Sequence, residues 1–176
     1  AVRVDGALRR VITTVPAGAP GRRPAVLVVG GIGCFSIDDA TADDAYRHLA
    51  HDLSRRGFLV MRVEKSGIGD SQGPPCPETD FEQELAGYDA ALRQLMADPR
   101  VDSRSVFVFG HSIGAIGAPQ LAARHPIAGL IVAQGVGRTW FEYDLINFRR
   151  QLELTNVDPA QIDQSLLEKA RCASRM

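Results

Sequence analysis

One serine lies in a sequence pattern that favours nucleophilic chemistry. Gly110-His111-Ser112-Ile113-Gly114 has a glycine two positions before the serine and another two positions after it. The apolar run Val106–Phe109 precedes this pattern and predicts a buried strand, and Ile113–Arg124 follows it and predicts a helix. A G-x-S-x-G segment between a strand and a helix is typical of a nucleophile elbow, whose serine attacks a carbonyl carbon. The alternative is a glycine-rich strand–helix turn without chemistry, which the flanking strand and helix disfavour.

The spacing of the two glycines has a steric reason. A serine in a sharp strand-to-helix turn takes a strained backbone conformation, so the residues two positions away must be small, as Gly110 and Gly114 are. The turn places Ser112 at the N-terminus of the next helix, where N–H groups and the helix dipole stabilise negative charge. The N–H of Ile113 is therefore the first expected donor to an oxyanion.

A second glycine-rich loop, Gly30-Gly31-Ile32-Gly33-Cys34, follows the continuous apolar run Ala25–Val29. The run predicts a strand buried on both faces, and glycines at its carboxyl end let the backbone approach a ligand closely. We expect the N–H of Ile32 to be the second oxyanion donor. The loop matches neither nucleotide-binding glycine fingerprint, and a plain tight turn stays open as an alternative. Cys34 lacks the elbow context of a nucleophile, and we expect it to be buried at the substrate pocket.

The histidines do not supply the general base that an activated serine needs. His111 precedes Ser112 within the turn and is expected to point away from it, and His125 lies at the far end of the following helix. His48 and His51 are three residues apart on an expected helix, a spacing compatible with a shared metal ion, but no third ligand is evident. We expect solvated helix histidines there, no metal site and no cofactor.

Four carboxylates near glycine-rich or aromatic segments are candidates for acid–base work. Glu64 and Asp70 flank a loop full of turn residues, where we favour a structural role with Asp70 and Ser71 capping local backbone groups. Glu142 and Asp144 are the remaining candidates for a triad acid.

Alternating strands and helices must position these groups. The alternation repeats at least three times with crossovers of adequate length, which predicts an α/β fold with a doubly wound, mostly parallel sheet. Glycine-rich loops fall at the carboxyl ends of the strands, where such sheets bind ligands. The stretch Val2–Val15, with a turn at Asp5-Gly6, predicts one or two antiparallel edge strands. The other expected elements are the helices Asp38–Arg56 and Asp80–Ala97 and the buried strands Phe58–Val63 and Ile127–Ala133.

An aromatic cluster opens the C-terminal part of the chain. Trp140, Phe141 and Tyr143 begin a helical stretch that runs to about Leu154, and a further amphipathic helix is expected over Ala160–Arg171. Trp140 and Phe141 are candidates for the wall of a substrate pocket or the anchor of a lid, and a packing role in a core is equally open. We therefore divide the chain into a core over residues 1–138 and a helical segment over residues 139–176.

Composition excludes several classes of partner. The chain has 176 residues, 45% of them hydrophobic, and a formal net charge of -1. Near-neutral charge gives no basis for nucleic-acid binding, and no apolar run approaches the about 20 residues of a membrane span. The three cysteines show no pairing or metal spacing, which favours a reducing, cytoplasmic compartment.

These motifs together resemble the α/β-hydrolase superfamily over about Val4 to Leu154. The resemblance rests on the Gly30–Gly33 loop, on Lys65–Ser71 in place of the family's R-G-x-G-x-S loop, and on the Gly110–Gly114 elbow. More narrowly, the chain is similar to bacterial hydrolases of the dienelactone hydrolase and prolyl-oligopeptidase-like branch.

The resemblance implies a serine hydrolase that acts on an ester, thioester or amide through an acyl-enzyme on Ser112. The aromatic segment from Trp140 to Arg150 would then begin a helical cap. In the family the triad acid and histidine follow the serine, after two later strands, and this sequence ends before either. We therefore expect the 176 residues to be a segment of a longer chain, and we expect this segment alone to be inactive or nearly so.

Two alternative functions stay open beside the hydrolase. A hydrolase-like scaffold without chemistry would bind a ligand or partner, and an acyltransferase would use the same serine with a different acceptor. The expected partner is a small-molecule acyl substrate or a peptide, not nucleic acid, and an exposed sheet edge favours self-association of this segment.

Overall fold

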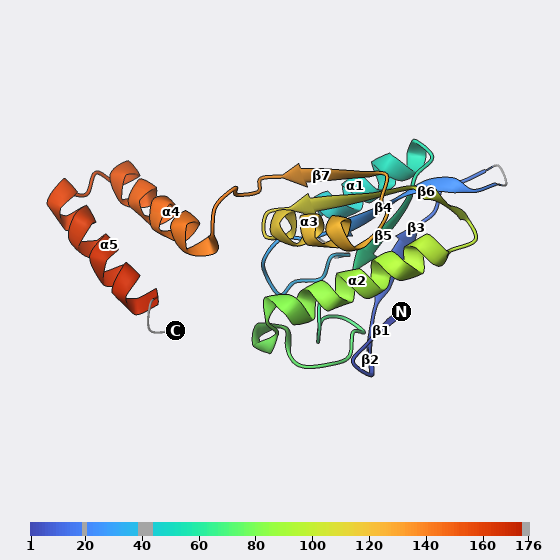
Figure 1. The fold of residues 1–176 in the computed structure, drawn as a ribbon, viewed down its shortest axis with the longest axis horizontal. Coiled ribbons are helices and arrows are strands. Elements are labelled where there is room, and N and C mark those ends of the chain that lie inside the picture. The colour runs from blue at the N-terminus through green and yellow to red at the C-terminus, as the bar shows by residue number, and fades with distance from the viewer. Residues whose placement is uncertain (19–20, 39–43, 174–176) are drawn as a thin grey trace. The chain divides into compact units, whose positions relative to one another are not determined.

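The computed structural model describes residues 1–18, 21–38 and 44–173. These residues form two compact units, Ala1–Gly135 and Val136–Met176, which are described separately below. Figure 1 traces the chain through both units.

The first unit is built on a five-stranded sheet whose strand order is β3-β5-β4-β6-β7. Neighbouring strands β5, β4, β6 and β7 are parallel, and the edge strand β3 is antiparallel to β5. This confirms the predicted mostly parallel α/β fold. The strands are β3 (Val11–Thr14), β4 (Arg23–Val29), β5 (Leu59–Val63), β6 (Val101–His111) and β7 (Gly129–Ala133).

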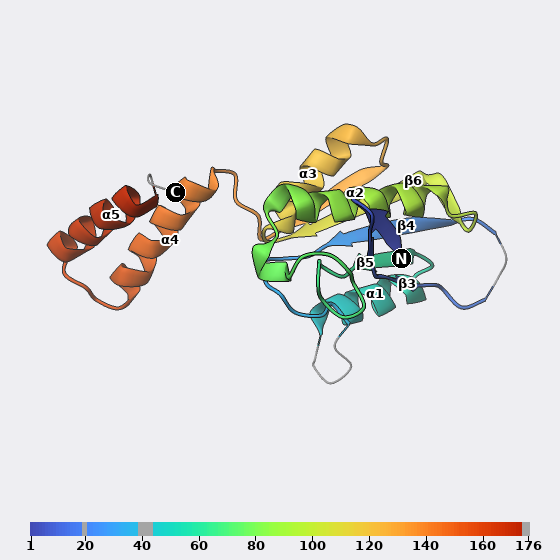
Figure 2. The same ribbon diagram turned by 90° about the horizontal axis from the view of Figure 1, so that it is seen from below.

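Helices cover both faces of this sheet, as Figure 2 shows. Helix α1 (Ala45–Arg55) lies on one face, and α2 (Phe81–Ala97) and α3 (Gly114–Arg124) lie on the other. Strand β4 supplies the core on both faces, because Leu27 packs into the cluster with α2 while Val26 packs with α1. The predicted burial of this strand on both faces is confirmed.

The N-terminal residues form a small hairpin of β1 (Val2–Val4) and β2 (Ala7–Arg9), separate from the main sheet. Asp5 and Gly6 make its turn with φ angles of 48° and 83°. The predicted antiparallel pairing is confirmed, but the stretch holds three strands and not one or two, and of these β3 is the one at the edge of the main sheet.

Two helix starts are set by aspartate caps. Asp44 accepts a hydrogen bond from the N–H of Tyr46 and begins α1, so this helix starts at Ala45 and not at Asp38 as predicted. Residues 39–43 of the predicted helix lie outside the described residues. Asp80 and Gln83 form a capping box at the start of α2, and the helix buries an apolar stripe of Leu85, Tyr88, Ala91, Leu92 and Leu95.

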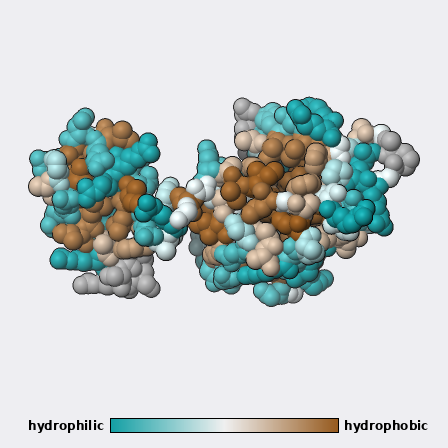
Figure 3. Space-filling view, turned by 45° about the horizontal axis from the view of Figure 1, so that its top comes forward, coloured by the Kyte–Doolittle hydropathy of each residue, from teal (hydrophilic) through white to brown (hydrophobic). Residues whose placement is uncertain are grey.

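The prediction that β7 is buried is wrong. Leu130, Ile131 and Val132 are 39%, 52% and 53% exposed, because within the described residues β7 pairs with β6 alone. Figure 3 shows a hydrophobic area on the face that carries β7. An apolar strand composition predicts a burial that the strand's place at the sheet edge does not provide.

A disulfide corrects the interpretation of the cysteines. Cys34 is bonded to Cys76 in the short 3-10 helix Cys76–Glu78, with 5.7 Å between the Cα atoms, and Cys172 is free and exposed. The two residues are 42 positions apart, so no local spacing announces the pair. Disulfides are rare in reducing compartments, so the cysteines do not support the predicted cytoplasmic location.

The second unit is a pair of helices, α4 (Trp140–Leu154) and α5 (Pro159–Ala173). Arg149 on α4 binds Asp163 on α5 at 2.8 Å, and Lys169 on α5 binds Asp144 at 2.9 Å. No helix among the described residues is long and apolar enough to cross a membrane.

Two glycine substitutions should have opposite effects on stability. A Cβ at Gly114 would lie 2.3 Å from the carbonyl oxygen of Val29, whereas a Cβ at Gly87, inside α2, meets nothing within 4 Å. We predict that Gly114→Ala lowers the free energy of unfolding by about 2–4 kcal/mol. Gly87→Ala should raise it by about 0.5–1 kcal/mol, because alanine loses less backbone entropy in a helix. Urea unfolding of the full-length protein measures both, and equal effects would contradict the packing described here.

The disulfide should contribute measurably to stability. Replacing Cys34 and Cys76 by serine removes a cross-link between residues 42 positions apart and should lower the free energy of unfolding by about 2–4 kcal/mol. Cys172→Ser is the matched control and should leave the urea midpoint unchanged. An unchanged midpoint in the double variant would show that the cross-link constrains nothing.

Candidate functional site

Ser112 occupies the sharp turn between β6 and α3. Its φ angle is +57°, in the left-handed region that non-glycine residues rarely adopt. The N–H of Ser112 donates to the carbonyl of Ala133 at 3.0 Å, and its carbonyl accepts from Ala115 at 2.9 Å. The neighbouring strand and the first helical turn therefore hold the strained conformation on both sides, as an elbow requires.

Both glycines of the elbow are required by close backbone contacts. A Cβ at Gly110 would lie 2.4 Å from the carbonyl oxygen of Gly114. A Cβ at Gly114 would lie 2.3 Å from the carbonyl oxygen of Val29 and 2.6 Å from that of Gly30. The contact with Gly30 brings the loop of residues 30–34, hereafter the glycine loop, directly against the elbow. A Cβ on Gly31 would be 3.4 Å from the Cβ of Ser112.

The N–H groups of the glycine loop are not equivalent. Gly30 donates to the hydroxyl of Tyr88 at 3.2 Å, and Gly31 donates to the hydroxyl of Tyr46 at 2.8 Å. Within the described residues, the N–H groups of Ile32 and Ile113 have no hydrogen-bond acceptor. The two N–H groups that the sequence singles out are therefore among those without an acceptor in the described part of the chain.

The two tyrosines that accept from the N–H groups of Gly30 and Gly31 stay neutral. Burial raises the pKa of the Tyr88 hydroxyl, and it also raises the pKa of Tyr46, against the opposing hydrogen bond from Gly31. A protonated hydroxyl can accept from a backbone N–H and donate to another group at the same time.

His111 is held by two partners and does not face the serine as a base. Its Nε2 lies 2.6 Å from Oε1 of Gln134, and its Nδ1 lies 2.7 Å from the hydroxyl of Tyr46. Because an amide oxygen only accepts, Nε2 carries the proton and Nδ1 accepts from Tyr46. Both ring nitrogens are therefore engaged, so neither is available to take the proton of Ser112 in this arrangement.

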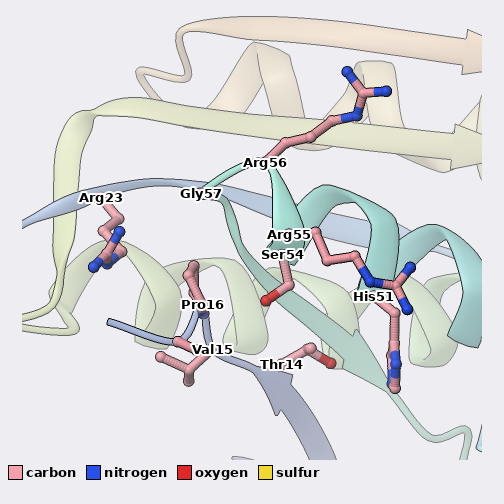
Figure 4. A pocket seen from close by; sticks show the side chains of 10 residues that line it. Thr14, Val15, Pro16, Arg23, His51, Ser54, Arg55, Arg56 and Gly57 are labelled. Atoms are coloured by element: carbon pink, nitrogen blue, oxygen red, sulfur yellow. The ribbon is translucent and has the colours of Figure 1, made fainter. Parts of the chain in front are cut away.

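The other histidines lie away from the elbow. Nε2 of His125 is 2.6 Å from the carboxylate of Asp89 on α2. His51 lines a hollow of about 670 Å³ at the amino end of β4, the opposite end of the strand from the glycine loop. Figure 4 shows that the guanidinium groups of Arg23 and Arg56 at this hollow point apart, so they do not converge on one ligand. No group of three metal-ligating side chains occurs among the described residues.

The four candidate carboxylates have other partners or lie in water. Glu64 is fully buried and accepts from Ser36 at 2.6 Å, while the side chain of Asp70 is 90% exposed. The predicted capping by Asp70 is not seen, and the Ser71 hydroxyl instead accepts from the N–H of Arg10. Glu64 has a structural role, since it holds Ser36 directly after the glycine loop.

The two carboxylates of α4 are engaged within the second unit. Glu142 accepts from Thr139 in a capping box, and these hydrogen bonds from Thr139 lower the pKa of its carboxyl group. Asp144 pairs with Lys169 at 2.9 Å. Each carboxylate is thus placed by contacts that stabilise helices.

The expected pocket residues fall in two parts of the structure. Cys34 is bonded to Cys76, so no thiol is present and the residue cannot act as a nucleophile. Trp140 and Phe141 are 49% and 45% exposed, so the second unit does not bury them as core residues. Trp140 packs against Tyr143 with 5.4 Å between the ring centroids.

The sequence and the fold are both similar to those of known proteins. The sequence matches the family described as serine aminopeptidase, S33, over residues 40–151. The chain belongs to this family of α/β-hydrolases. It is also 30% identical over 120 residues to the esterase EstD of Thermotoga maritima, an alignment that covers 68% of this chain and 28% of EstD.

Solved structures show the same fold at lower identity. The DcsB complex with its substrate analogue has a TM-score of 0.65 at 21% identity, covering 90% of this chain and 53% of DcsB. Est1E from Butyrivibrio proteoclasticus, solved with ferulic acid, has a TM-score of 0.62 at 20% identity, covering 76% and 52%. The chain thus spans about half the length of these two proteins.

Sequence reasoning missed the side chains that hold the glycine loop. Tyr46, Tyr88 and Lys65 each bond Gly30 or Gly31. Tyr88 is part of the apolar stripe of α2, and Tyr46 lies in the first turn of α1. Their role in binding the glycine loop becomes visible only once the end of β4 is known to lie between these helices. The position of Lys65, in a glycine-rich loop directly after a buried strand, could have indicated such a role from the sequence.

Substitution of His111 tests its exclusion as the base. We predict that His111→Gln keeps kcat/KM for p-nitrophenyl butyrate in the full-length protein within about tenfold of wild type. Ser112→Ala should lower it by about 10⁴ or more, because it removes the nucleophile. An equal loss in both variants, with both proteins folded, would make His111 the base after all.

Proposed function

We propose that the protein is a serine hydrolase of the esterase type, with Ser112 as nucleophile. The observation that carries the proposal is one constellation. A serine at φ +57° lies against a glycine loop, and the N–H groups of Ile32 and Ile113 lack acceptors within the described residues. The family match and the likeness to the esterase EstD support the same class of reaction.

In the proposed reaction, Oγ of Ser112 attacks the carbonyl carbon of an ester, thioester or amide. The serine proton passes to a general base, and the carbonyl oxygen becomes an oxyanion that accepts from the N–H groups of Ile32 and Ile113. The tetrahedral intermediate collapses to an acyl-serine, and the leaving alcohol, thiol or amine takes up the proton. Water then attacks the acyl-serine by the same route in reverse and releases the acid.

The general base belongs, in this proposal, to residues outside the 176 described by this sequence. His111 and His125 are both held by other partners. The apolar edge of β7, 39–53% exposed along Leu130, Ile131 and Val132, supports this because a further strand would cover it. The 176 residues alone should therefore turn over esters poorly.

We propose residues 139–176 as a helical segment whose exposed Trp140 and Phe141 bind an apolar group. Support comes from their exposure and from a nearby hollow of about 280 Å³ lined by Val136–Arg138, Tyr143 and Ile146.

Covalent labelling tests the proposed nucleophile. The full-length protein incubated with a fluorophosphonate should gain one phosphonyl group, and peptide mass spectrometry should place it on Ser112. Ser112→Ala should take up none, and Ser66→Ala, which changes a buried serine of another loop, should label as wild type does.

The same experiment separates the alternatives. A folded full-length protein that is not labelled would favour the ligand-binding module. A labelled protein whose acyl-serine reacts faster with an added alcohol or amine than with water would favour the acyltransferase.

A further inference from the structure

Lysine is scarce in this chain, and one of its two lysines is buried beside the glycine loop. Lysine and arginine together number 20, and 18 of these are arginines. Lys65 lies just after β5 with 9% of its surface exposed, while Lys169 lies on α5 in the second unit. An ammonium group removed from water is costly unless charged or polar partners surround it. The groups that bind the Lys65 ammonium therefore indicate the role of this buried charge.

The ammonium of Lys65 has two described partners. Nζ donates to the carbonyl oxygen of Gly31 at 2.8 Å, in a buried hydrogen bond, and lies 3.0 Å from a carboxylate oxygen of Glu84. A hydrogen bond from a charged donor is about twice as strong as one between neutral groups. Glu84 balances the charge, and Gly31 receives the directed bond.

That bond fixes a specific N–H group. The carbonyl of Gly31 and the N–H of Ile32 belong to one planar peptide unit, which is trans. In a trans peptide the C=O and N–H bonds point in opposite directions. Because Lys65 holds the carbonyl on one side, the N–H of Ile32 must point to the other side, and no described residue accepts from it there.

Without this anchor, the glycine side of the peptide does little to oppose its rotation. Gly31 has no Cβ, so its ψ angle, one of the two dihedrals about which this peptide turns, is permissive. A rotated peptide would present the carbonyl oxygen of Gly31 in place of the N–H of Ile32. An oxygen there would repel a developing oxyanion instead of stabilising it.

We propose that Lys65 is a positioning residue of the oxyanion hole, acting through the Gly31–Ile32 peptide with Glu84 as its counter-ion. The proposal rests on the proposed function of Ser112. Tyr46 assists by holding the N–H of Gly31, so both ends of this residue are fixed.

The test compares variants of Lys65 in the full-length protein. Lys65→Met removes the cationic donor and keeps the length of the side chain. We expect kcat for p-nitrophenyl butyrate to fall by about 10–100-fold, with KM changed by less than about threefold, because only the transition state uses the oxyanion donor. Affinity for a trifluoromethyl ketone, which forms a tetrahedral adduct with the serine, should fall by the same factor as kcat/KM.

Three further variants separate positioning from stability. Lys65→Arg restores a cationic donor and should recover kcat to within about fivefold of wild type. The double variant Lys65→Met/Glu84→Gln removes both charges, so it should unfold at higher urea concentration than Lys65→Met and yet remain as slow. Arg55→Met is the control, since it removes an exposed cation on α1 that pairs with Asp52, and should behave as wild type.

Activity that follows the urea midpoint, and not the presence of a cation at position 65, would overturn the proposal. So would a wild-type kcat in folded Lys65→Met, or an equal loss of affinity for substrate and trifluoromethyl ketone. Failure of the proposed function would give a different result, because the fluorophosphonate would then not label Ser112 in the wild-type protein.

Discussion

The backbone of Gly114 touches the carbonyl oxygens of Val29 and Gly30 so closely that no side chain fits between them. This contact joins the end of β4 to the start of α3 and sets the distance between the glycine loop and Ser112. Parallel strands alone bring their carboxyl ends to one edge of a sheet with room for side chains between them. Close packing at Gly114 narrows that gap, so that the glycine loop lies directly against the elbow that carries Ser112.

The glycine loop and the residues after it are then fixed from behind by charged side chains of one short segment. Arg62, at the end of β5, donates to the carbonyl of Ile37 at 2.8 Å, and Glu64 accepts from Ser36 at 2.6 Å. Both are almost fully buried, as is Lys65. A buried charge that loses its partner raises the free energy of the folded state, so these contacts oppose movement of the glycine loop.

A line of hydrogen bonds connects the two loops with β7. It runs from the N–H of Gly31 to Tyr46, from Tyr46 to His111, and from His111 to Gln134 at the end of β7. Gln134 has a φ angle of +53°, so strained residues lie at the carboxyl ends of two neighbouring strands. Three strand ends are thus held in register around Ser112, with tyrosines whose burial keeps them neutral. Rigid placement of donors before a ligand arrives is what makes such a site effective.

Local sequence determined much of this protein. The elbow, the glycine loop, the apolar stripe of α2 and the burial of β4 all follow from short-range patterns, because strand and helix periodicities and glycine spacing act over a few residues. Tertiary structure decided the remainder. The pairing of Cys34 with Cys76, the partners of His111 and the exposure of β7 depend on segments far apart in sequence. So does Lys65, whose contact with Gly31 joins residues 34 positions apart and arises only when β5 and β4 lie side by side. A pattern of residues records what a segment prefers, and only the folded chain shows which distant group meets it.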